Sequence, residues 1–184
     1  TIGIIGLNEM CMNYLGDDYN IETEDGIYFS KVVINHINNK IKTFQGESKD
    51  WYNGRGLYWN LELVPAEGVA HRFAKHDKFK YDNIITANGS GVGCWLPADQ
   101  QYNLSFASKH QDELQDLFSG GANFNLYLEG SNVRPEAIKD ILYKLLTNTS
   151  LPFISISPTI YICPICGKKG EEYCYHPELK KEGK

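Results

Sequence analysis

Two cysteines late in the chain have the spacing of a metal knuckle. Cys163 and Cys166 enclose a Pro-Ile pair and precede a glycine, so both thiolates can face one ion from a tight turn. Cys174 and His176 follow and could complete a tetrahedral zinc shell, although one residue between two ligands is an unusually short spacing. The alternative is a pair of reduced surface cysteines. The pattern favours a structural zinc site with these four ligands.

A second candidate site lies where a predicted strand meets a predicted helix. Residues 61–64 read Leu-Glu-Leu-Val, an apolar strand pattern, and Pro65 can open a helix. The first N–H groups of such a helix point outward and, with the helix dipole, favour a phosphate group. Every helix start offers these donors, so an ordinary strand-to-helix turn is the alternative. The candidate substrate-binding residues are Pro65, Ala66, Glu67, Gly68 and Val69.

Other chemically active side chains have simpler explanations. Cys94 has no flanking cation to activate its thiol, and Cys11 lies on the apolar face of a predicted helix, so both are expected to be inert. His36 and His110 have no neighbouring ligand set and are expected at the surface. The basic stretch 71–76 is typical of a solvated helix face, although it could add a charged contact to a nearby phosphate.

Composition narrows the function classes. The chain has 184 residues and a formal net charge of −5, which argues against a general nucleic-acid binder. No apolar run approaches the roughly 18 residues of a membrane span, and no signal peptide is visible. Five cysteines, an odd number, fit a reducing cytoplasm better than a disulfide framework. The apolar start at Thr1, without an initiator Met, suggests a piece of a longer protein.

The elements that must position these residues alternate between helix and strand. The sequence predicts five helices, and residues 77–108 lack periodicity and are expected to form a long loop. A strand, the fifth helix near Pro135 and a second strand form a βαβ unit, whose strands should be parallel with a right-handed crossover. The first four predicted helices are 7–15, 31–44, 66–76 and 109–118, and the last two strands are 123–128 and 151–157.

Five segments in order resemble the anaerobic (class III) ribonucleoside-triphosphate reductases. Their order and sensible spacing make the resemblance fairly specific over nearly the whole chain. The segments are Thr1–Glu9, Leu63–Gly68 with Arg72–Asp77, Phe118–Gly121 with Tyr127-Leu128, Leu151–Thr159, and Cys163–Gly167.

The resemblance implies an α/β fold, namely a segment of the ten-stranded α/β barrel of glycyl-radical enzymes with a small C-terminal zinc-ribbon module. Residues 1–158 would form the partial barrel and residues 159–184 the zinc-binding knuckle. In that family the segment matching Pro65–Val69 contacts the substrate phosphates. The family's ribbon cysteines match Cys163 and Cys166; Cys174 would be a third ligand and His176 would replace the fourth.

Two parts of the family's machinery have no counterpart in this sequence. These are the loop whose cysteine becomes a thiyl radical and the glycine, in an Arg-Val-x-Gly-Tyr-like context, that stores the radical. The chain is therefore expected to be a fragment or subunit, inactive alone, of a cytoplasmic reductase that converts ribonucleoside triphosphates to deoxyribonucleoside triphosphates. The expected partners are that triphosphate substrate, the remaining reductase fragment or subunit and a radical-SAM activase, with no membrane and no direct nucleic-acid binding.

Zinc is the expected cofactor, and the glycyl radical is expected on a segment absent from this chain. A different class of function is a non-catalytic, zinc-stabilised module, derived from the same fold, that binds nucleotides or a partner. A third is a zinc-ribbon interaction protein.

Overall fold

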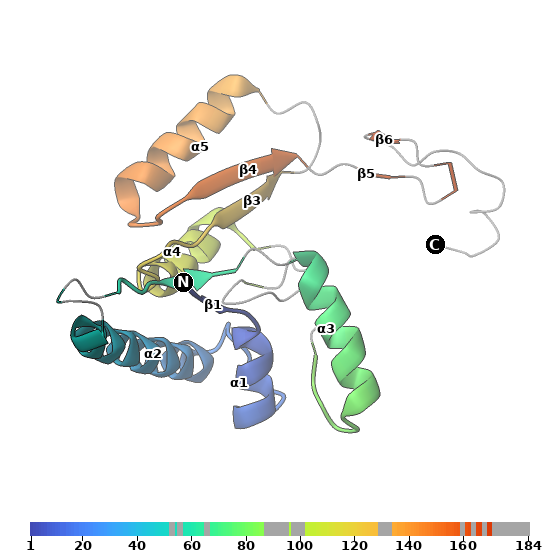
Figure 1. The fold of residues 1–184 in the computed structure, drawn as a ribbon. Coiled ribbons are helices and arrows are strands. Elements are labelled where there is room, and N and C mark those ends of the chain that lie inside the picture. Colours follow the sequence, from blue (N-terminus) through green and yellow to red (C-terminus); the bar gives the residue numbers. More distant parts are fainter. Residues whose placement is uncertain are drawn as a thin grey trace. The chain divides into compact units, whose positions relative to one another are not determined.

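The computed structural model of the chain (Figure 1) describes residues 1–51, 54, 57–64, 67–86, 96, 102–128, 134–158, 161–162, 165–166 and 169–170. They fall into two compact units, Thr1–Phe124 with Leu145–Phe153, and Asn125–Lys144 with Ile154–Lys184. The predicted boundary after residue 158 stays a prediction. The first elements of the chain are β1 (Ile2–Ile4), α1 (Leu7–Leu15), α2 (Glu24–Trp51), β2 (Leu61–Leu63), α3 (Glu67–Lys80) and α4 (Leu104–Gln115). They are followed by β3 (Phe124–Leu128), α5 (Pro135–Asn148), β4 (Ile154–Pro158), β5 (Tyr161–Ile162) and β6 (Lys169–Gly170).

The first unit is built around β2. β1 pairs with β2 in parallel, with Ile2 opposite Leu61. On the other edge of β2, the Gly120 N–H donates to the Leu61 carbonyl at 2.6 Å, and the Leu63 N–H donates to the Gly121 carbonyl at 3.1 Å. β2 is therefore bonded along both edges. Its two leucines are almost completely buried.

Helices α1, α2 and α4 cover this strand with an apolar core. Ile34 and Ile41, two turns apart on α2, are buried because the long helix is apolar at helical spacing along one face. Each such side chain contributes about 1.5–3 kcal/mol when fully buried. The buried members of the cluster are Leu7, Ile21, Ile34, Ile41, Leu61, Leu63, Leu114, Phe118 and Ala122.

Two helices begin earlier than the periodicity predicts, because polar residues cap them. The predicted helix 31–44 begins at Glu24, where the Thr23 hydroxyl accepts the Gly26 N–H at 3.0 Å. The predicted helix 109–118 begins at Leu104, where the Asn103 side chain accepts the Phe106 N–H at 2.8 Å. The predicted loop 77–108 was therefore wrong at both ends, since α3 also continues to Lys80.

The predicted strand–helix–strand unit is present as β3, α5 and β4. α5 begins at Pro135, as predicted. The Phe124 N–H donates to the Phe153 carbonyl at 2.8 Å, and Ser155 hydrogen-bonds Asn125, so the two strands start side by side and are parallel (Figure 1). The described strands form three two-stranded sheets, and a ten-stranded barrel stays a prediction about a larger assembly. No helix in the described ranges has the length and apolar character to cross a bilayer.

Candidate functional site

The candidate site lies at the carboxyl edge of the β1–β2 pair. Because the strands are parallel, both chains leave the pair at this edge and enter helices, α1 after β1 and α3 after β2. Val64 and Val69 pack with Ile5 around the buried Ala70, which holds the first turn of α3 against the strand ends. Ligands of open α/β sheets bind beyond the carboxyl ends of their strands. The fold therefore places the start of α3 where a ligand is expected.

The predicted substrate-binding residues lie around this helix start. Glu67, Gly68 and Val69 form the first turn of α3, one residue later than the helix start predicted at 66. Val69 is half-buried. Pro65 and Ala66 lie outside the described residues, as does the side chain of Glu67. The backbone N–H groups of this first turn are those that an α-helix leaves without intrahelical acceptors, so the turn can donate to an anion.

The basic stretch on α3 is solvated. Arg72, Lys75 and His76 are all exposed, and His76 lies 3.7 Å from the Asp77 carboxylate. The side chain of His71 is not described. The interpretation of this stretch as a solvated face therefore holds for the three side chains that the structure describes.

His110 does not lie at the surface as predicted. Its ring is only 5% exposed, and Nε2 lies 2.7 Å from the Ile21 carbonyl oxygen. On the same residue, the Ile21 N–H donates to the Asn8 side-chain oxygen at 3.0 Å. Asn8 is 1% exposed. Both backbone groups of Ile21 are thus bound by buried side chains, one from α1 and one from α4.

The environment of His110 keeps its ring neutral. Burial lowers its pKa, although the Ile21 carbonyl opposes the shift. A neutral ring that donates from Nε2 can accept at Nδ1, where the Gln111 amide lies 3.0 Å away. Gln115 then donates to Gln111 at 2.8 Å, which continues the buried chain of hydrogen bonds along α4. His110 is therefore a structural residue. Its position between Phe106 and Leu114, four residues from each, was the signal in the sequence that the prediction overlooked.

The prediction that Cys11 is a buried, inert cysteine is confirmed. Cys11 is 0% exposed, and its sulfur lies 3.4 Å from the Ser30 hydroxyl. Burial raises the pKa of the Cys11 thiol, which keeps it protonated and unreactive. His36 is exposed, as predicted. Cys94 lies outside the described residues.

Glu9 is a functional candidate that the sequence reasoning missed. Burial raises its pKa to about 7. Its Oε2 atom is buried and has no hydrogen-bond partner in the described part of the chain. Glu9 lies in the first turn of α1, at the same carboxyl edge as the start of α3. A carboxyl group with this pKa can donate or accept a proton near neutrality.

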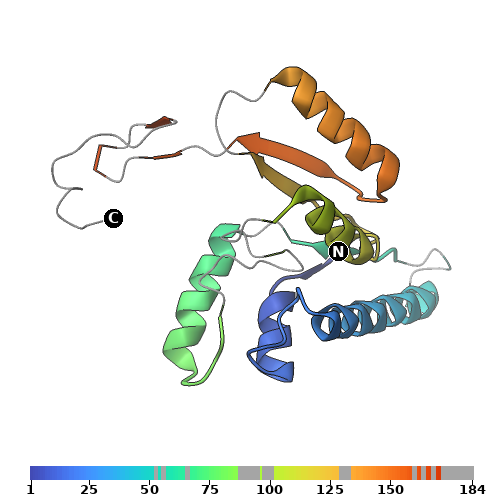
Figure 2. The same ribbon diagram turned by 180° about the vertical axis from the view of Figure 1, so that it is seen from behind.

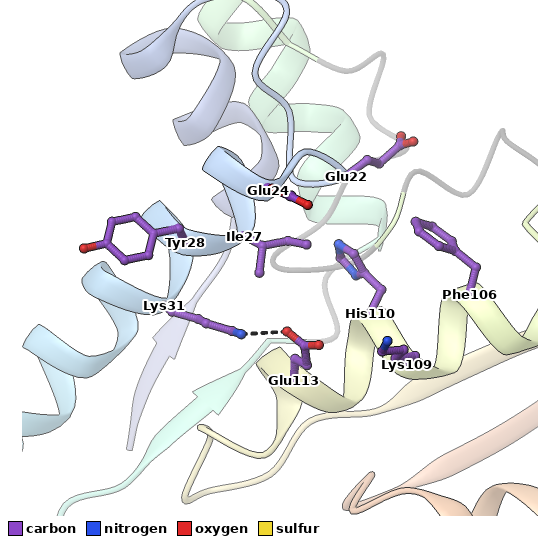
Figure 3. Close-up of a pocket in the computed structure, with 9 residues that line it drawn as sticks. All are labelled: Glu22, Glu24, Ile27, Tyr28, Lys31, Phe106, Lys109, His110 and Glu113. Atoms are coloured by element: carbon purple, nitrogen blue, oxygen red, sulfur yellow. Dashed lines mark hydrogen bonds and ion pairs between the residues drawn. The ribbon is translucent and has the colours of Figure 1, made fainter.

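A separate groove of about 580 Å³ lies between the start of α2 and α4 (Figure 3). Lys31 and Glu113 form an ion pair of 2.6 Å across it, and this pair lowers the pKa of Glu113. The edge of the His110 ring also lines the groove. Phe106 and Tyr28 stand at its two ends, far from each other (Figure 3). The groove therefore combines apolar and mixed-charge side chains, and none of its described lining residues belongs to the predicted sites.

Two short paired strands stand before and after the first two predicted zinc ligands, Cys163 and Cys166. β5 pairs with β6 in antiparallel fashion, with Ile162 opposite Lys169, so residues 163–168 connect two paired strands. Cys166 lies in this connection and is exposed. Cys163, Cys174 and His176 lie outside the described residues. Within the described set no three metal-binding side chains gather in one place, so the zinc shell stays a prediction.

Solved structures show to which class this fold belongs. The crystal structure of the anaerobic ribonucleotide reductase from Thermotoga maritima, determined with MES in the active site, matches with a TM-score of 0.58 and 22% sequence identity. The match covers 91% of this chain and 29% of that one. A second solved anaerobic ribonucleotide reductase matches with a TM-score of 0.57 and 21% identity, over 91% of this chain and 28% of that one. The fold is that of part of an anaerobic ribonucleotide reductase.

The family model of the anaerobic ribonucleoside-triphosphate reductases matches residues 1–181. The chain belongs to this family, which confirms the resemblance found in the five segments. It spans less than a third of the length of the two solved reductases. No curated protein sequence matches it.

Proposed function

We propose that the chain is the part of an anaerobic ribonucleotide reductase that binds the phosphates of a ribonucleoside triphosphate and carries a structural zinc site. The single observation that carries the proposal is the family match over residues 1–181. The parallel β1–β2 pair supports it, because its carboxyl edge leads directly into the Pro65–Val69 segment.

The phosphate site would use backbone donors and the α3 dipole. N–H groups of Glu67, Gly68 and Val69 belong to the first turn of a 14-residue helix, where the partial positive charge of the dipole is concentrated. Gly68 carries no side chain to obstruct a phosphate oxygen. Pro65 and Ala66 would shape the approach to this turn.

Reduction of the nucleotide would require parts that this sequence does not supply. A radical-storing glycine and the cysteine that forms the thiyl radical would come from the remaining reductase polypeptide, and a radical-SAM activase would generate the glycyl radical. The chain alone would therefore bind substrate without reducing it. Under strict anaerobiosis, reductase activity should appear only when the remaining polypeptide and the activase are present.

Titration of the 184-residue chain with ribonucleoside triphosphate and with inorganic tripolyphosphate, followed by calorimetry, tests the phosphate site. The Gly68→Asp variant should keep the fold, because an acidic residue suits a helix N-terminus, but it should repel the phosphates and weaken binding at least tenfold. Equal binding by wild type and variant would refute the placement of the phosphates at α3.

The zinc site would be formed by Cys163, Cys166, Cys174 and His176. The β5–β6 hairpin supports this proposal, because it brackets the first cysteine pair in the way that a knuckle requires. Metal analysis of purified protein should find one zinc per chain, and Cys163→Ser should lose it. The matched control is Cys11→Ser, which alters a buried cysteine outside the segment and should keep the metal. Metal-free wild type would refute the site.

A further inference from the structure

Helix α3 is loosely packed for an element that carries a binding site. Among its side chains that the structure describes, only Ala70 is buried. Phe73 is 51% exposed and Phe79 is 90% exposed. The apolar contacts that hold the helix are gathered at its first turn, around Ala70. A 14-residue helix is about 21 Å long, so a contact near its far end constrains the direction of the helix axis more than the cluster at its first turn does.

Asn13 on α1 holds the chain just beyond that far end. Its Nδ2 donates to the Ile85 carbonyl at 2.7 Å, and its Oδ1 accepts the Ile85 N–H at 2.9 Å. Nδ2 also donates to the Glu9 carbonyl, one turn earlier on α1, at 2.7 Å. One amide side chain thus binds both backbone groups of a residue 72 positions away. A side-chain amide presents a donor and an acceptor side by side without carrying a charge, so it can bind both backbone groups of one residue.

The path of the chain shows what this pair of hydrogen bonds constrains. After α3 the chain turns back between α3 and α1, toward the end of α1 that follows β1 (Figures 1 and 2). Among the described residues, the cluster around Ala70 and the Asn13–Ile85 pair attach the segment that runs from β2 through α3 to β1 and α1. Two separated attachments fix the direction of a helix axis, whereas one attachment leaves a pivot.

We propose that Asn13 is a positioning residue for the phosphate-binding turn of α3. The inference rests on the proposed function, since it concerns the same turn. By holding Ile85, Asn13 fixes the axis of α3 and thereby the direction of the N–H groups of Gly68 and Val69. Phosphate binding and the Asn13–Ile85 hydrogen bonds are then coupled in both directions, because a ligand that orders the first turn of α3 must also favour the state in which these hydrogen bonds are formed.

Asn13→Ala and Asn13→Asp test the proposal in the 184-residue chain, with inorganic tripolyphosphate as the probe. Alanine removes both hydrogen bonds to Ile85 and the one to the Glu9 carbonyl, and aspartate replaces the donor with an oxygen that repels the Ile85 carbonyl. Each variant should raise the Kd about tenfold with unchanged stoichiometry, whereas a partly unfolded protein would lower the stoichiometry instead. Asn35→Ala is the matched control, since Asn35 is an exposed helical asparagine whose side chain makes no hydrogen bond within the described ranges.

Hydrogen exchange of the wild type tests the coupling without any substitution. Saturating tripolyphosphate should slow exchange of the Ile85 amide about tenfold. This factor equals the change in Kd expected when the Asn13–Ile85 hydrogen bonds are removed, because the coupling acts equally in both directions. An unchanged Kd in the folded Asn13 variants, or unchanged Ile85 exchange in the wild type on saturation, would overturn the proposal. If the wild type did not bind tripolyphosphate at all, the proposed phosphate site would fail and the inference with it. Binding by the wild type with no effect of Asn13 would refute the inference alone.

Discussion

The buried His110–Ile21 contact makes the sharpest prediction about stability. His110→Leu replaces the ring with an apolar side chain of similar size, so the cavity term should be small. The Ile21 carbonyl, which lies 2.7 Å from Nε2, would lose its donor inside the protein, and Gln111 would lose an acceptor. A buried polar group left unsatisfied costs about 1–3 kcal/mol. For these two groups together we therefore expect a loss of roughly 2–6 kcal/mol in the free energy of unfolding.

Urea denaturation at pH 7.5 measures this loss, and His36→Leu provides the control. His36 is an exposed histidine whose side chain makes no hydrogen bond in the described part of the chain, so the same substitution there should change the free energy of unfolding by less than about 0.5 kcal/mol. Equal effects of the two substitutions would refute the reasoning, since they would show that the contact with Ile21 contributes nothing beyond what water supplies to the unfolded chain.

The same variant predicts how stability changes with pH. Burial lowers the pKa of His110 in the folded state, so below its ordinary value, near 6.5, the unfolded chain binds more protons than the folded one. The stability contributed by His110 is therefore complete above about pH 6.5 and declines as the pH falls below it. The difference in stability between wild type and His110→Leu should shrink in acid. A difference that stays constant from pH 7.5 to pH 5 would contradict a neutral buried ring.

Three further substitutions test other contacts. Glu9→Gln should stabilise the protein at pH 8 by up to about 3 kcal/mol and make little difference below pH 4.5. The reason is that the pKa of Glu9 rises from 4.5 to about 7 on folding, so ionisation of the buried carboxyl opposes the folded state. Thermal unfolding across this pH range measures the effect, and no gain in stability at pH 8 would contradict the prediction. Gly26→Ala should lower the free energy of unfolding, measured by chemical denaturation, by about 1–3 kcal/mol or more, since its Cβ would lie 1.9 Å from the Asn20 carbonyl oxygen. Gly46→Ala in the same helix is the control: its Cβ meets no atom within 4 Å, so it should stabilise the protein by about 0.5–1 kcal/mol. Glu113→Gln should cost less than about 1 kcal/mol, because Glu113 is exposed and water reaches the half-buried Lys31, and the cost should fall in high salt; a larger, salt-independent loss would refute a surface ion pair.

Elements with strong local signals could be predicted from the sequence. The strand before Pro65 and the helix starting at Pro135 were found because apolar spacing and proline position act within a few residues. The early starts of α2 and α4 were missed because a single capping residue sets each one. Thr23 and Asn103 stand outside the apolar pattern, and their role depends on a side chain bending back to a backbone N–H.

The contacts that organise the candidate site join residues far apart in the sequence. His110 reaches Ile21 across 89 positions, and Asn13 reaches Ile85 across 72. Local periodicity contains no information on which distant backbone group a polar side chain will meet. A polar residue on an apolar helix face, as at Asn8 and His110, indicates a buried partner without identifying it. Glu9 belongs to the same class, since only burial in the fold raises its pKa.

Helices α1 and α3 both start at the carboxyl edge of the β1–β2 pair, and they differ in how far their side chains are buried. The first turn of α1 is largely buried, because Leu7 is 2% exposed, Asn8 uses its side chain to hold the Ile21 N–H, and the Glu9 Oε2 atom is buried. Its cap residue, Gly6, adopts a left-handed φ of 85°, which turns the chain from β1 directly into that packed turn. α3 has no comparable cover over its described length beyond the small cluster around Ala70. Of the two helices, α3 is therefore the one whose described side chains are mainly exposed, which supports the proposed phosphate site at Pro65–Val69 beside the family match.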